Sequence, residues 1–193
     1  EAAHALGVPM TREQTLQLRS LGKGPSQEKL DGFFGPGAAN YDAIRAKRID
    51  LMEAHIARYG IDEKPGIREL LAYLAQRQIP CAITSSSSIP VIRRHLGNLG
   101  LLEGFTALCS GKDVPHGKPA PDIYLHGSAV LGLKPEACLA IEDSPAGIEA
   151  AYRAGTHPVI VPDQDQPSAE TRSRCFAKAD SLLDVIPLLE TLK

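Results

Sequence analysis

The first third of the chain has apolar residues at helical spacing and no run that reads as a strand. Thr11 and Ser26 each precede an amphipathic stretch, and Asn40 precedes a longer one that ends near Tyr59. Side-chain oxygens of Thr, Ser and Asn accept hydrogen bonds from the first free amides of a helix, so these residues suit helix starts. We therefore predict a small all-helical unit over residues 1–64.

Glu, not Met, is the first residue of the sequence. Residues 1–10 read as the end of a helix that is closed by Gly7, because glycine is favoured where a helix stops. We expect them to complete a helix that leads from a second domain into the helical unit.

From residue 65 onward, short apolar runs alternate with amphipathic stretches. Runs of this kind, flanked by helices and without polar alternation, are typical of a parallel sheet covered on both faces. The pattern predicts an α/β domain over residues 65–193, with a Rossmann-like, three-layer parallel-sheet core. The expected strands are 79–83, 107–109, 137–141 and 157–161, and the expected helices are 67–74, 89–96, 122–131, 145–154 and 181–189.

Composition narrows the classes of protein to consider. The chain has 193 residues, of which 43% are hydrophobic and 23% are charged, and its formal net charge is −2. These values are ordinary for a globular protein, and the charge does not favour a nucleic-acid partner. No apolar stretch is long enough for a membrane span and no signal peptide is evident, so we expect a cytoplasmic protein. No long apolar surface stripe is evident either, so we expect a monomer. Its four cysteines form no C-x-x-C pair and its six histidines lack metal-ligand spacing, so we expect reduced thiols and no zinc.

Polar residues follow three of the predicted strands or lie in a loop between them. They are Thr84 and Ser85, Lys118, and the adjacent carboxylates Glu142 and Asp143. In a parallel sheet, residues at the carboxyl ends of strands meet at one edge. Hydroxyls and a lysine can bind a phosphoryl group, and paired carboxylates can hold a hard cation, for which Mg²⁺ fits oxygen ligands best.

Each of these features alone also has a purely structural explanation. Residues 84–88 could be a polar turn, Ser144 could cap a helix, and Lys118 could be a solvated loop lysine. Two other motifs are excluded: residues 111–118 lack the spacing of a P-loop, and no G-x-S-x-G elbow is present.

Three longer stretches point to a family. Residues 83–87 read I-T-S-S-S, residues 114–124 read V-P-H-G-K-P-A-P-D-I-Y, and residues 140–147 read A-I-E-D-S-P-A-G. With K-P-G-I at 64–67, the chain resembles the haloacid dehalogenase-like (HAD-like) hydrolases. The resemblance is to the branch with a helical cap, which includes sugar-phosphate phosphatases and β-phosphoglucomutase, and it covers essentially the whole chain.

The resemblance implies a Mg²⁺-dependent phosphatase that acts on a small phosphorylated metabolite, such as a sugar phosphate. It implies that Thr84 or Ser85 hydrogen bonds the phosphoryl group, that Lys118 stabilises its charge, and that Asp143 and Glu142 hold Mg²⁺. Catalysis is then assigned to Lys118 and Thr84.

The family nucleophile is an aspartate of a D-x-D motif on the first core strand, which the resemblance places upstream of residue 1. We therefore expect the 193-residue chain to lack one sheet strand and to be inactive by itself. Residues 163–165 read D-Q-D but follow the last predicted strand in a proline-rich loop, so they do not replace the motif.

Three alternatives stay open at this point. A β-phosphoglucomutase-like isomerase would use the same residues, with Lys23 as a candidate contact for a distal phosphate. A dehalogenase would leave the paired carboxylates without a metal to bind. A non-catalytic phospho-ligand-binding protein or fragment would need no nucleophile.

Overall fold

A computed structural model describes residues 1–19, 21–163 and 166–191. The chain divides into two compact units, Glu1–Asp62 and Glu63–Lys193, close to the predicted division after residue 64. Among the described residues, no helix has the length and apolar character needed to cross a membrane. Gln164 and Asp165 of the D-Q-D stretch lie outside the described residues.

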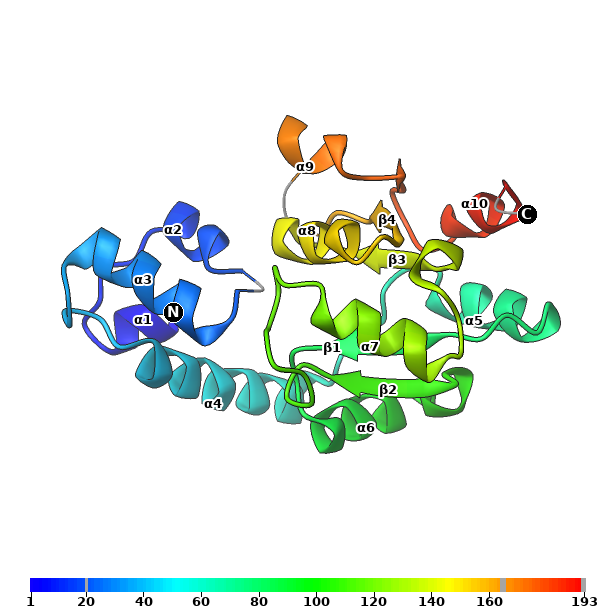
Figure 1. Cartoon of the computed structure of the whole chain (residues 1–193). Helices are drawn as coiled ribbons and strands as arrows, with labels where there is room; N and C mark the ends of the chain where they lie inside the picture. Colours follow the sequence, from blue (N-terminus) through cyan, green and yellow to red (C-terminus); the bar gives the residue numbers. More distant parts are fainter. Residues whose placement is uncertain (20, 164–165, 192–193) are drawn as a thin grey trace. The chain divides into compact units, whose positions relative to one another are not determined.

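The first unit is helical, as predicted. Its helices are α1 (Ala2–Ala5), α2 (Arg12–Gln17), α3 (Lys23–Phe34) and α4 (Tyr41–Tyr59). Its core brings together residues from α1, α3 and the segments beside them (Figure 1). The buried members of this core are Ala3, Val8, Met10, Leu30 and Ala39.

Capping explains where most of these helices begin and end. Thr11 accepts a hydrogen bond from the amide of Gln14, whose side chain bonds the Thr11 amide in return, and Asn40 accepts from the amide of Ala43. Gly7 ends α1 with a φ of 75°, as expected for a left-handed helix stop.

The prediction for α3 was wrong at its start. The helix begins at Lys23, with Gly22 as its N-cap, and Ser26 is fully buried inside it. Lys23 accordingly lies in the first turn of a helix, and its ammonium forms a 2.6 Å ion pair with Asp42.

The second unit alternates helices and strands. Its strands are β1 (Ala82–Ser85), β2 (Ala107–Ser110), β3 (Leu139–Glu142), β4 (His157–Ile160) and β5 (Ala177–Lys178). Its α-helices are α5 (Ile67–Gln76), α6 (Ile89–Asn98), α7 (Asp122–Val130), α8 (Pro145–Arg153), α9 (Ala169–Ser173) and α10 (Val185–Thr191). Two short 3₁₀ turns, η1 (Leu102–Gly104) and η2 (Pro135–Ala137), complete it.

All strand pairs in the described residues are parallel. β1 pairs with β2, with Thr84 opposite Cys109, and β3, β4 and β5 form a second sheet in that order. Glu142 is opposite Ile160 in that second sheet. Between the described residues of β1 and β3 there is no ladder of hydrogen bonds, which is consistent with the expected lack of one strand.

Strand positions differ from the sequence prediction by up to three residues. β1 begins at Ala82 and not at Ile79, so Thr84 and Ser85 are strand residues and not part of the following turn. β3 is shifted in the same way. It begins at Leu139, because Ala137 belongs to the preceding 3₁₀ turn, and it ends at Glu142. Neither β5 nor α9 was predicted, and both are only a few residues long.

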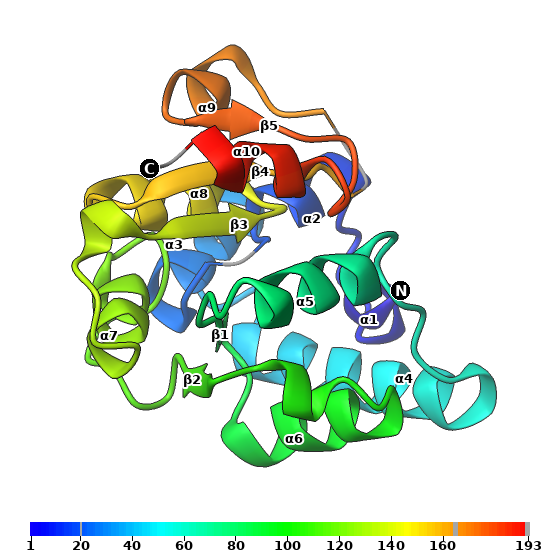
Figure 2. The ribbon, with the colours of Figure 1, turned by 90° about the vertical axis from the view of Figure 1, so that its right-hand side faces the viewer.

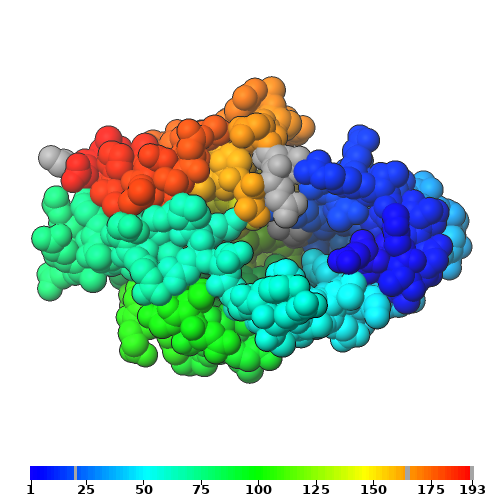
Figure 3. All heavy atoms as spheres, turned by 180° about the vertical axis from the view of Figure 1, so that it is seen from behind, coloured from blue at the N-terminus to red at the C-terminus, as the bar shows by residue number. Residues whose placement is uncertain are grey.

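Helices cover both faces of the strands, which confirms the three-layer α/β architecture. One apolar cluster joins α5 to Val159 of β4 and Val185 of α10, and the other joins α7 and α8 to Ala140 of β3. In Figure 2, α7 and α8 lie on one side of the strands and α5 and α10 on the other. Figure 3 shows the surface of α10 directly against that of α5.

Candidate active site

Residues from four segments meet at the carboxyl ends of the strands. Thr84 is the second-to-last residue of β1, Lys118 is in the loop between β2 and α7, and Glu142 is the last residue of β3. Asp143 follows directly, before Ser144 caps α8. This is the edge at which the sequence predicted a site.

Lys118 and Glu142 form the centre of this arrangement. The Lys118 ammonium donates to Glu142 Oε1, and the two side chains are only 8% and 7% exposed. A buried charge is costly unless it is paired, so each of these groups requires the other.

Further donors surround the Glu142 carboxylate. The Tyr124 hydroxyl donates to Oε1, while the Ser144 hydroxyl and the Asp143 amide donate to Oε2 over 3.2 and 3.3 Å. Four donors, two for each oxygen, therefore fix the orientation of this carboxylate.

Gly147 in α8 makes this close packing possible. A Cβ atom at Gly147 would lie 2.0 Å from Glu142 Oε2, so only glycine lets the first turn of α8 approach the carboxylate. Its amide donates to Ser144 Oγ over 3.2 Å, so the same hydroxyl caps the helix and contacts Glu142.

Thr84 joins the group from β1 by packing against α7, the helix that carries Tyr124. A Cβ at Gly127 of this helix would lie 2.9 Å from the Thr84 methyl group. One helix, whose Tyr124 was not predicted as a site residue, thus contacts Thr84 as well as the Lys118–Glu142 pair.

Ser85 belongs to a separate set of hydrogen bonds. Its hydroxyl accepts from the amide of Ser87 over 3.1 Å, and its carbonyl accepts from the amide of Gly111. The buried Ser110 hydroxyl joins the same two loops by donating to the carbonyl of Ser87. These contacts order the loops after β1 and β2, beside the Lys118 segment.

Tyr124 is the site residue that sequence reasoning missed. It is 6% exposed, and burial, followed by the negative charge of Glu142, raises its pKa well above the ordinary value. The charge of Asp143 raises the Tyr124 pKa in the same direction. A tyrosine inside a helix that packs on the sheet was a usable signal, since a buried tyrosine hydroxyl normally has a polar partner.

The carboxylates are the candidate metal ligands. Glu142 and Asp143 are adjacent, but among the described residues no three His, Cys, Asp or Glu side chains come together as a metal-binding group. Two carboxylates without nitrogen or sulfur donors match the preference of Mg²⁺, which usually keeps several waters.

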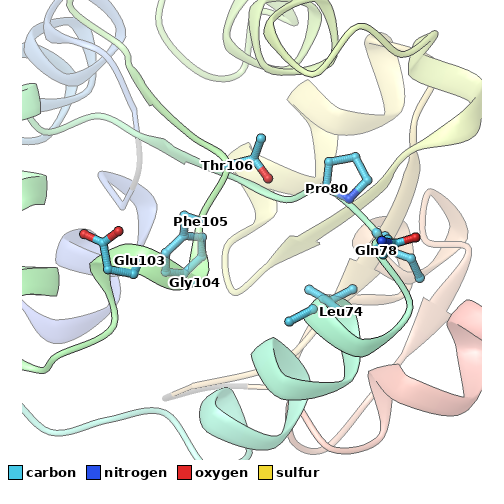
Figure 4. Close-up of a pocket in the computed structure, with 9 residues that line it drawn as sticks. Leu74, Gln78, Pro80, Glu103, Gly104, Phe105 and Thr106 are labelled. Carbon is cyan, nitrogen blue, oxygen red and sulfur yellow. The ribbon is translucent and has the colours of Figure 1, made fainter.

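A cavity of this unit lies away from these residues. A cavity of about 330 Å³ is lined by residues such as Leu74, Pro80 and Phe105 (Figure 4). Pro80 and Phe105 precede β1 and β2, so this cavity is at the amino ends of the strands, opposite the Lys118 cluster.

Comparison with known proteins identifies the family. The model of the haloacid dehalogenase-like hydrolases matches residues 12–155. The chain belongs to this family.

Relatives of this HAD-like chain include sugar-phosphate enzymes. Hexitol phosphatase A of Escherichia coli is 42% identical over 121 residues, which are 62% of this chain and 54% of that protein. Beta-phosphoglucomutase of Bacillus subtilis is 32% identical over 174 residues, 86% of this chain and 74% of that protein. A mutant CbbY from Rhodobacter sphaeroides, solved with xylulose-1,5-bisphosphate, has a TM-score of 0.72 at 26% identity, covering 95% of this chain and 84% of that one.

These relatives confirm the family and the α/β fold. The chain spans about half the length of hexitol phosphatase A.

Proposed function

We propose that the protein is a Mg²⁺-dependent phosphatase that hydrolyses the phosphate ester of a small metabolite, with sugar phosphates as its substrate class. The observation that carries the proposal is the buried Lys118–Glu142 ion pair at the carboxyl edge of the sheet, where Asp143 directly follows Glu142 and where β1 carries Thr84. The similarity to hexitol phosphatase A and the xylulose-1,5-bisphosphate complex of CbbY support the substrate class.

In this proposal each polar side chain has a distinct task. Lys118 stabilises the charge of the phosphoryl oxygens, and its ion pair with Glu142 holds the lysine in place. Thr84 hydrogen bonds the phosphoryl group, and Ser85 contributes through the loop that it orders. Fixed donors of this kind stabilise charge that develops in a transition state, because they need no reorganisation during the reaction.

Asp143 and Glu142 are the residues that would hold Mg²⁺. Of the two, Asp143 is the more exposed, while Glu142 is buried and already accepts from four donors. We therefore assign Asp143 the main ligand role. When bound, the ion neutralises negative charge on the phosphoryl group.

The proposed nucleophile is an aspartate. An aspartate upstream of residue 1 attacks phosphorus, the ester P–O bond breaks, and a second aspartate protonates the departing alcohol. Water then releases inorganic phosphate and regenerates the free aspartate. Among the described residues, β1 and β3 each pair with a strand on one side only, which is consistent with a further strand between them. Ile141 in the middle of β3 is 38% exposed, which is high for a strand in a covered sheet.

Phosphate release is the direct test. The protein with its upstream segment is assayed on sugar phosphates and other small phosphate esters, with and without Mg²⁺. We expect Asp143→Asn to lower turnover roughly 10²- to 10³-fold. This variant is a better test than a substitution of Lys118, because Lys118 also stabilises the buried charge of Glu142. Asp180→Asn, which changes a carboxylate that pairs with Lys178 at the surface, is the matched control and should keep full turnover.

Full activity in Asp143→Asn would contradict the metal-ligand role. Activity of a preparation proven by intact mass to begin at Glu1 would contradict the upstream nucleophile. Absence of phosphate release from every ester, in a folded protein that binds inorganic phosphate, would favour the binding-protein alternative.

The similarity to beta-phosphoglucomutase favours a second candidate, an isomerase that moves phosphate between positions of a sugar. Product analysis separates the two, since a phosphatase releases inorganic phosphate and a mutase interconverts sugar phosphates without releasing it. The cytoplasmic location and the monomeric state stay predictions.

A further inference from the structure

Tyr124 contacts both members of the buried ion pair. Its hydroxyl donates to Glu142 Oε1. Its ring lies beneath the Lys118 ammonium, with 5.1 Å between the nitrogen and the ring centroid. A cation over an aromatic face is attracted by the ring electrons, so ring and hydroxyl both act on the lysine.

Tyr124 lies on a helix that packs against both sheets. Thr84 belongs to β1 of the first sheet and Glu142 to β3 of the second, and the described residues of these strands do not pair. The helix α7 packs with Ala140 of β3, and its Gly127 lies against the Thr84 methyl group. The position of the Tyr124 hydroxyl at Glu142 is therefore set by packing on both sheets.

The chemistry of Glu142 Oε1 explains why the hydroxyl matters. This oxygen accepts from both the Lys118 ammonium and the Tyr124 phenol, whereas Oε2 faces Ser144 and the Asp143 amide. A phenol adds a donor without adding charge, so within the described part of the chain Lys118 is the single cation that contacts the carboxylate. With all four donors in place, the carboxylate cannot rotate without losing a hydrogen bond.

We propose that Tyr124 is a positioning residue that holds Glu142, and through it Lys118, in the orientation needed to stabilise a phosphoryl group. Its effect on turnover rests on the proposed function, but its effect on Lys118 does not. Tyr124→Phe removes only the hydroxyl and keeps the ring under the lysine. Tyr73→Phe is the matched control, because the Tyr73 hydroxyl bonds Glu190 over 3.4 Å on the exposed surface.

The primary measurement is hydrogen exchange of the Lys118 ammonium, followed by NMR on protein labelled with ¹⁵N-lysine. We expect exchange in Tyr124→Phe to be about tenfold faster than in the unmodified protein, the size expected when a hydrogen bond to a charged group is lost. Tyr73→Phe should leave it unchanged. Denaturant unfolding of both variants shows that each is folded under the conditions of the measurement.

The second measurement is the steady-state kinetics of Tyr124→Phe. If the protein hydrolyses phosphate esters, Tyr124→Phe should lower kcat about tenfold and leave KM within about twofold, because the lysine acts mainly on the charge of the transition state. Faster Lys118 exchange, together with no phosphatase activity in the unmodified protein that includes its upstream segment, would support the positioning role and refute the proposed function. Unchanged exchange would overturn the positioning role, whether or not the protein is active.

Discussion

Lys118 and Glu142 form an ion pair between the loop before α7 and the last residue of β3, and both side chains are almost fully buried. They are 24 positions apart in the sequence. Since neither charge is in contact with bulk water, the pair contributes to the fold as well as to the proposed chemistry.

Replacing Lys118 should therefore reduce stability as well as activity. We expect Lys118→Met to lower the free energy of unfolding by about 3–5 kcal/mol, because it leaves the Glu142 charge buried without its cation. Lys64→Met is the matched control: Lys64 pairs with Asp163, its side chain is 53% exposed, and its loss should cost less than about 1 kcal/mol. Urea denaturation measures both. A cost below 1 kcal/mol for Lys118→Met would show that the pair does not stabilise the fold.

A methyl group at Gly147 should displace the Glu142 carboxylate. The added Cβ would lie 2.0 Å from Oε2, so Gly147→Ala must move either the carboxylate or the start of α8, and we expect a loss of about 1–3 kcal/mol. Gly97→Ala adds the same atom to α6 in open space and should stabilise the protein by about 0.5–1 kcal/mol. Thermal unfolding of both variants checks the opposite signs, and a neutral Gly147→Ala would contradict the packing at this position.

Asp122 gives the site loop a predicted pH dependence. Its carboxylate accepts from the side chain of His116 over 2.9 Å and from the His116 amide over 3.1 Å, and these bonds hold the pKa of Asp122 below its ordinary value. The folded state thus favours the ionised carboxyl. Its stabilising effect is present above the pKa of an unfolded Asp and is lost as the pH falls through the lower folded value.

His116→Ala should raise the Asp122 pKa toward its ordinary value, as measured by NMR titration of the carboxyl carbon. The stability difference between the two proteins should shrink as the medium is acidified through that range. His126→Ala changes a histidine on α7 itself and should leave the Asp122 titration in place. An unchanged Asp122 titration in His116→Ala would refute this link.

Ser110 is expected to hold the loops after β1 and β2 together. Its buried hydroxyl donates to the Ser87 carbonyl over 2.8 Å and accepts from the Lys112 amide over 3.0 Å. Ser110→Ala should cost about 1–3 kcal/mol and speed hydrogen exchange at the Lys112 amide. Ser173→Ala removes one exposed hydrogen bond, to the Glu170 carbonyl, and should cost less than about 0.5 kcal/mol. Equal costs for the two serines would contradict the linking role of Ser110.

Local patterns predicted the helices with clear caps and the order of the elements. The side chains of Asn40 and Ser144 each accept the backbone hydrogen bond expected of an N-cap, and α4 has the predicted bounds Tyr41–Tyr59. The start of α3 was wrong because Ser26 is buried in the helix and Gly22 takes the cap position. The observed strand limits differ from the predicted ones by up to three residues. The apolar run 79–83, for example, includes loop residues that precede β1, which begins at Ala82.

The residue types of the chain determined the kind of chemistry that it can perform. A lysine, hydroxyls and neighbouring carboxylates near the strand ends can be identified from the spacing of residues in the sequence alone. Which of these groups touch was decided by tertiary packing. Only the approach of α7 and α8 to the strands brings the Tyr124 hydroxyl to Glu142 and leaves Gly147 without room for a side chain. Contacts of that kind depend on distances between segments far apart in the chain, and no local sequence pattern contains those distances.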